Sequence, residues 1–80
     1  MNIYLIEQTD NQNYDTFDSA IVAASTEDKA RLIHPSDIEN WDGQSDKYGT
    51  WVNSEMVTVT LIGLAIDNKK GVLLASFRAG

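Results

Sequence analysis

Carboxylates are the first side chains to consider for chemistry in this sequence, because it has twelve Asp and Glu residues and only six Lys and Arg residues. Two stretches hold four acids each and no base: residues 7–18 (EQTDNQNYDTFD) and residues 37–46 (DIENWDGQSD). Paired carboxylates can act as general acid and base, but this needs apolar neighbours that raise one pKa. Both stretches are instead rich in Asn, Gln, Ser and Gly, which is typical of surface loops. We therefore expect solvated acidic loops, which serve either recognition or only solubility.

Other catalytic and metal-binding patterns are missing from the sequence. It has no cysteine, and His34 is its one imidazole. We expect His34 to stabilise the C-terminal end of a helix through the helix dipole. A calcium loop starting at Asp10 fails, because Gln12 and Tyr14 occupy its third and fifth positions and no glycine follows. The sequence has no phosphate-binding glycine motif, so it predicts no enzyme, no metal site and no cofactor.

The net charge of −6 limits the classes of partner. Nucleic-acid binding needs a Lys and Arg footprint, and anionic lipids also repel an acidic chain. No run of about 18 apolar residues predicts a membrane span, and the N-terminus lacks the features of a signal peptide. We therefore expect a cytoplasmic protein whose partner, if the charge has a role in recognition, presents a basic surface.

Aromatic residues lie within or beside both acidic stretches. Tyr and Trp are favoured at interfaces because they bury a large area and keep a polar tip. Trp41 and Trp51 could equally attach an irregular segment to the core, whereas Tyr14, at a loop tip, is expected to be exposed. The predicted partner-binding residues are Asp10, Tyr14, Asp15, Asp18, Asp37, Glu39, Trp41, Asp42 and Asp46.

The elements that must position these residues follow from local patterns. Alternating apolar residues and turn formers predict strands over residues 2–8, 17–24, 56–66 and 72–78. Ser25 or Thr26 caps a helix that runs to about His34, where Pro35 stops it. Residues 36–39 fit a capping box for one further helical turn, and residues 67–71 predict a hairpin loop.

The predicted fold is a single α+β domain over residues 1–80, in the order β-β-α-β-β. One helix packs on one face of a small antiparallel four-stranded sheet. The expected strand order is 2-1-3-4, with strand one between strands two and three.

Several motifs resemble a family of short proteins encoded by bacteriophages and mobile elements. They are IYLIEQ, YDTFDSAIVAA, AR-x-IHP (residues 30–35), YGTW (residues 48–51) and the terminal ASFRAG. The segment Y-D-T-[FY]-D-S-A is the most specific of them, and the resemblance spans nearly the whole chain. Many short acidic phage proteins inhibit host defence, the anti-CRISPR proteins among them, and the resemblance implies such a role in the bacterial cytoplasm.

The leading hypothesis is therefore a stoichiometric inhibitor of a bacterial defence complex, such as a CRISPR effector. Its acidic loops would meet the Lys and Arg residues of a nucleic-acid-binding surface. A non-inhibitory phage interaction or regulatory module is the alternative, and an enzyme acting on a small polar substrate is a further rival. The chain is expected to be a monomer or a homodimer, because short sheets leave unpaired edges.

Overall fold

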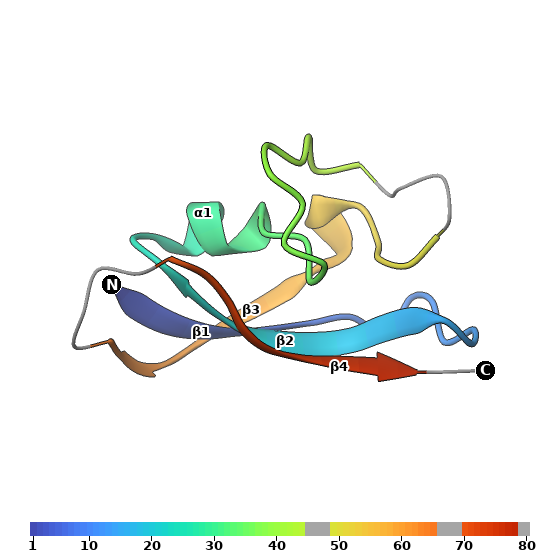
Figure 1. The fold of residues 1–80 in the computed structure, drawn as a ribbon, viewed down its shortest axis with the longest axis horizontal. Helices are drawn as coiled ribbons and strands as arrows, with labels where there is room; N and C mark the ends of the chain where they lie inside the picture. The colour runs from blue at the N-terminus through green and yellow to red at the C-terminus, as the bar shows by residue number, and fades with distance from the viewer. Residues whose placement is uncertain (45–48, 66–69, 79–80) are drawn as a thin grey trace.

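A four-stranded sheet forms one layer of the molecule, and the helix and most of the irregular chain form the other (Figure 1). This computed structural model describes residues 1–44, 49–65 and 70–78. The α+β fold predicted from the sequence, one antiparallel sheet with a single helix, is confirmed. The elements are β1 (Asn2–Glu7), β2 (Thr16–Ala24), α1 (Glu27–Arg31), the 3-10 helix η1 (Ser54–Met56), β3 (Thr58–Leu64) and β4 (Gly71–Arg78).

The strand order is β3-β1-β2-β4. The prediction that strand one lies between strands two and three is confirmed, but the predicted position of strand four beside strand three is wrong. β4 pairs with β2 rather than with β3, and the chain between β3 and β4 therefore joins opposite edges of the sheet instead of closing a hairpin. The pairing aligns Phe17 with Phe77, whose rings lie 4.7 Å apart, and Val22 with Val72. Pairing of β4 with β2 brings apolar side chains of the two strands together. This packing outweighs the local preference of residues 67–71 for a hairpin turn.

Period-two alternation determines which face of the sheet is covered. Tyr4 and Ile6 of β1 and Ala20 and Val22 of β2 are buried and face the second layer. A bulge at Asp18, where the register with β4 shifts between Phe17 and Ser19, changes the alternation at the start of the strand.

Helix α1 is shorter than the pattern predicted, because it ends at Arg31 and not at His34. Thr26 is the N-cap, and its hydroxyl accepts a hydrogen bond from the Lys29 amide at 3.1 Å. After the helix the chain turns sharply, since the Asp37 amide donates to the His34 carbonyl at 2.8 Å and Asp37 has φ of 59°. This left-handed residue stops any helical continuation, so the turn predicted at residues 36–39 does not become a helix.

A cover segment, defined here as residues 32–44 and 49–53, lies over the sheet beside α1 and completes the core (Figure 1). Trp51 and His34 are its most deeply buried large side chains, and both are at most 1% exposed. Trp51 therefore belongs to the core. His34 also has a different role from the one expected, because it is a buried ring and not an exposed group at a helix end.

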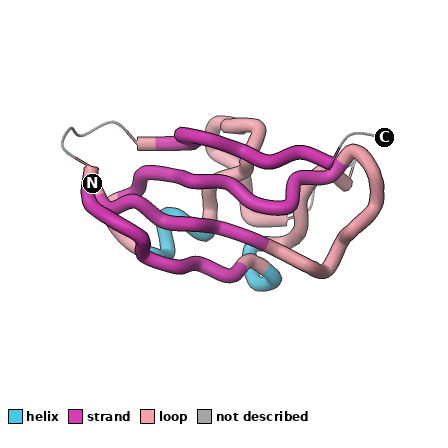
Figure 2. The backbone as a smooth tube through the Cα atoms, turned by 90° about the horizontal axis from the view of Figure 1, so that it is seen from below, coloured by secondary structure: helices cyan, strands magenta, loops and turns pink. Residues whose placement is uncertain are grey.

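Nothing in the described part of the chain covers the opposite face of the sheet, which Figure 2 views from below with the helix and loops behind the strands. Among the described residues, no helix has the length and apolar composition needed to cross a membrane.

Candidate functional site

The loop between β1 and β2 is organised around one buried amide, Gln8, which is 6% exposed. Its Nε2 donates to the carbonyls of Asn11 and Phe17, at 2.8 and 2.9 Å. Its Oε1 accepts from the Asn11 backbone amide at 2.8 Å. One side chain therefore satisfies backbone groups on both arms of the loop, which holds the loop in a single shape.

Further hydrogen bonds fix the loop internally and against the cover segment. The Thr16 hydroxyl donates to the Asn13 carbonyl at 2.5 Å, and the Asn13 amide donates to Asn11 Oδ1 at 3.1 Å. Asn11 Nδ2 reaches the Gly49 carbonyl at 3.1 Å, and the Phe17 amide donates to the Thr50 carbonyl at 2.9 Å. The loop is thus ordered by its own polar side chains although few of them are buried.

This ordered loop, named here the acidic loop (residues 8–18), presents an aromatic ring and carboxylates to solvent. Tyr14 is 73% exposed, and Asp10 and Asp15 are also exposed. Asp15 has φ of 62°, a left-handed conformation that Asp and Asn tolerate better than most residues. Asp18 is half-buried at the bulge, and its carbonyl accepts from the Gln8 amide at 3.1 Å.

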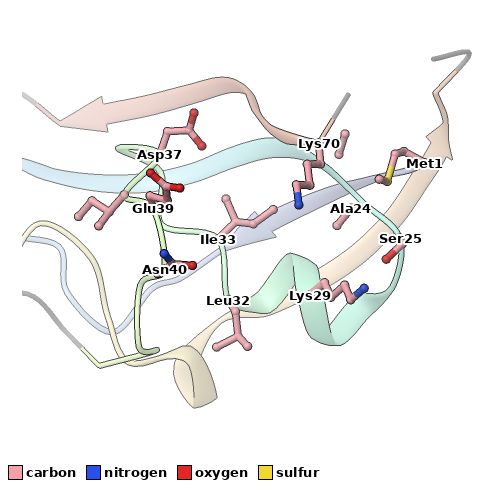
Figure 3. Close-up of a pocket in the computed structure, with 12 residues that line it drawn as sticks. Met1, Ala24, Ser25, Lys29, Leu32, Ile33, Asp37, Glu39, Asn40 and Lys70 are labelled. Atoms are coloured by element: carbon pink, nitrogen blue, oxygen red, sulfur yellow. The ribbon is translucent and has the colours of Figure 1, made fainter. Parts of the chain in front are cut away.

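The second acidic stretch lies in a different environment. Asp37 and Glu39 line a hollow of about 630 Å³ together with Lys29 and Lys70 (Figure 3). The hollow has apolar side chains on its inner wall, Ile33 among them. Because two ammonium groups share the hollow with these two carboxylates, the charge there is mixed and not purely acidic.

Asp37 and Glu39 also lie at the opposite end of the sheet from the acidic loop. The Asp37 carboxylate is next to Gly71, where an added Cβ would stand 3.2 Å from Asp37 Oδ1. Gly71 pairs with Ala23 near the end of β2, whereas Asp15 directly precedes its start. Seven residues of extended strand, about 23 Å, separate the two ends. The structure therefore does not gather the predicted acids on one patch.

The remaining predicted site residues lie in the cover segment or outside the described residues. Asp42 is exposed, and its Oδ1 accepts from the Gln44 amide at 3.0 Å. Trp41 is half-buried, and its Nε1 donates to the Gln44 carbonyl at 2.6 Å. Its ring also packs edge-on against His34, with ring centroids 5.4 Å apart. Trp41 thus helps to hold the cover segment, while Asp46 lies outside the described residues.

His34 is a satisfied core residue. Its Nδ1 accepts from the Ser36 amide at 3.0 Å, which in a neutral ring leaves the proton on Nε2, 3.5 Å from the Thr50 hydroxyl. Phe17 packs edge-on against it from the sheet, at 6.3 Å between ring centroids. Within the residues that the structure describes, no three His, Cys, Asp or Glu side chains are placed to share a metal ion.

Gln8, which organises the acidic loop, is not among the binding residues predicted from the sequence. The alternation along the strand does indicate that Gln8 faces inward, because Gln8 follows the buried residues Tyr4 and Ile6 at a spacing of two. A polar side chain at the next inward position of a strand needs hydrogen-bond partners, and the loop backbone supplies them.

The motif AR-x-IHP, part of the family resemblance, has structural contacts in the fold. Ala30, His34 and Pro35 are buried. The Arg31 guanidinium donates to the carbonyls of Ser54 and Val57, which joins α1 to the chain entering β3. These residues support the sheet and cover layers and do not form a surface site.

Comparison with known proteins gives no family. No family model matches this chain, and no curated protein and no solved structure matches it either.

Proposed function

We propose that this chain is a non-enzymatic binding protein that blocks a bacterial anti-phage defence complex, in the manner of an anti-CRISPR protein. It would bind with fixed stoichiometry, and the acidic loop would contact Lys and Arg residues of a nucleic-acid-binding surface. The observation that supports this most directly is the loop itself, in which buried Gln8 holds exposed Tyr14, Asp10 and Asp15 in one arrangement.

Order in the free loop favours binding. A loop that already has its bound shape loses little conformational entropy on association. Tyr is among the residues that contribute most to protein interfaces, and Tyr14 is the most exposed aromatic side chain among the described residues. Carboxylates around an aromatic anchor match a basic surface and increase the rate of association.

The proposed interface is smaller than the one expected from the sequence. Asp37 and Glu39 share their hollow with two lysines and lie at the far end of the sheet from Asp15. We therefore assign recognition to the acidic loop, with Asp10, Tyr14, Asp15 and Asp18. Asp37 and Glu39 are left outside the interface.

Affinity capture from a phage-host lysate tests this function, with the wild-type chain and Tyr14→Ala as baits. Because Tyr14 is exposed, the substitution is expected to leave the fold intact while it removes the aromatic anchor. Mass spectrometry should identify a nucleic-acid-binding component of a defence complex on the wild-type bait and little of it on Tyr14→Ala. Titration of that complex should reach full inhibition at a fixed molar ratio.

Other outcomes would contradict the proposal. Capture of a phage or host housekeeping protein would indicate the non-inhibitory interaction module. Inhibition at far less than one copy per target would indicate catalysis. Equal capture by both baits would exclude Tyr14 from the interface.

A further inference from the structure

The uncovered face of the sheet has an apolar row on three neighbouring strands, and a threonine continues this row on the fourth. Strand register aligns Thr60 of β3 with Leu5 of β1, Leu5 with Ile21 of β2, and Ile21 with Leu74 of β4. Leu74 is 64% exposed, and neither Leu5 nor Ile21 belongs to the core cluster or packs against it. In a soluble domain such a continuous apolar row usually marks an interface.

A glycine on the same face lies beside the register shift between β1 and β3 and leaves open space above the sheet. Gly63 of β3 pairs with Ile3 of β1, so it lies on the uncovered face. A Cβ added there would meet no atom within 4 Å, and Gly63 does not have a left-handed φ. Glycine inside a strand often marks a bulge, such as the register shift beside Gly63, or the close approach of another backbone. The missing side chain therefore leaves room for something outside this copy of the chain.

We propose that this face, centred on Leu5, Ile21 and Leu74, is the interface of a homodimer in which two sheets pack face to face. The second copy would lie about 10 Å from the first sheet, as in other packed sheets. A two-fold arrangement makes the same apolar row self-complementary.

The size of the face agrees with a second copy as the occupant. Four strands about 4.8 Å apart and about seven residues long cover roughly 19 by 23 Å, so two such faces bury about 900 Å² of flat area. Side-chain relief increases this value toward the roughly 1,200 Å² at which specific protein interfaces begin. We therefore expect a dimer that dissociates on dilution.

Charge placement also permits self-association despite the net charge of −6. The acidic loop lies beyond one end of the sheet, and Asp37 and Glu39 lie on the covered side. By register, Glu7 belongs to the uncovered face, in a row with Thr58 and Ser19 next to the apolar row. A two-fold axis at the apolar end of the face therefore separates the two Glu7 side chains.

A dimer would also extend the small hydrophobic core of the chain. A domain of this length buries a modest fraction of its surface, and association is one common way to increase that fraction. Packing the two uncovered faces together would place apolar side chains on both sides of each sheet.

Sedimentation equilibrium over a roughly thousandfold range of concentration tests the dimer. The wild-type chain should change from monomer to dimer across this range. Leu74→Lys and Gly63→Val should each raise the dissociation constant about tenfold or more, by charge burial and by steric exclusion. Leu61→Lys is the matched control. It replaces a leucine of similar exposure, 58%, that pairs with Tyr4 on the other face of the sheet.

Each outcome decides the question. A wild-type chain that stays monomeric throughout overturns the proposal. A dimer weakened by Leu74→Lys but not by Gly63→Val would be paired through the β4 edge, which also overturns it. An equal loss with Leu61→Lys would place the interface elsewhere. Thermal unfolding separates folding defects. Because a Cβ at position 63 meets no atom within 4 Å, we expect Gly63→Val to unfold at the wild-type temperature or above at low concentration.

Discussion

At the residue scale, the shape of the acidic loop depends on Gln8. An amide side chain donates and accepts at the same time, and Gln8 uses both abilities, toward the Asn11 and Phe17 carbonyls and the Asn11 amide. A carboxylate at this position could only accept, and an apolar residue would leave these backbone groups without partners. The arrangement is local, and it explains how a largely polar loop keeps one conformation.

Replacement of Gln8 by Ala should lower the free energy of unfolding by about 1–3 kcal/mol, since three hydrogen bonds are lost and their backbone partners are partly buried. Urea denaturation measures this loss, and hydrogen exchange should show faster exchange of the Asn11 amide. Gln12→Ala is the matched control, because Gln12 is exposed and bonds the Thr9 carbonyl near solvent. A loss of less than about 0.5 kcal/mol for Gln8→Ala would remove Gln8 from its organising role.

The residues around this loop show which parts of a site a sequence can predict. The exposure of Tyr14 follows from turn-forming neighbours, and it is confirmed. The positions of Trp41 and Trp51 could not be decided, because each depends on where an irregular segment crosses the sheet. Asp37 and Lys29 are close only through the fold, so the mixed charge of their hollow was not predictable.

At the element scale, Arg31 connects α1 to the start of β3. Its guanidinium bonds the carbonyls of Ser54 and Val57, which follow the cover segment. Glu27 lies 3.7 Å from the same guanidinium in an exposed i,i+4 pair on the helix. The first contacts link distant parts of the chain, whereas the second remains within one helical turn.

Arg31→Met should therefore destabilise the fold by about 1.5–3 kcal/mol, because it removes hydrogen bonds donated by a charged group. Glu27→Gln should cost less than about 0.5 kcal/mol, since an exposed ion pair contributes little. Chemical denaturation of both variants measures the difference. Similar losses for the two would mean that the salt bridge, and not the carbonyl contacts, stabilises this junction.

The elements themselves were predictable where the pattern is local. The four strands lie close to their predicted positions, because alternation of apolar residues is read over a few neighbours. The end of α1 and the position of β4 were wrong. The C-cap at Leu32 and the pairing of Phe17 with Phe77 decide these, and neither follows from a short window of sequence.

At the scale of the whole molecule, the fold divides the negative charge. The first acidic stretch becomes an ordered loop at one end of the sheet, and the second contributes to a hollow with lysines at the other. The sequence shows the two stretches but not the distance of about 23 Å along β2 between Asp37 and the acidic loop. We therefore propose that the acidic loop acts alone in recognition.

The most direct test compares two double variants with the same change of charge. The affinity of the partner captured by the wild-type chain is measured at low and moderate salt for Asp10→Asn/Asp15→Asn and for Asp37→Asn/Glu39→Gln. Asn keeps the left-handed conformation accessible at both Asp15 and Asp37. We expect the loop variant to bind about tenfold more weakly at low salt and to lose much of its salt dependence, while the other variant stays within about twofold of wild type. Equal losses for the two variants, or a wild-type affinity that does not change with salt, would contradict the assignment of recognition to the acidic loop.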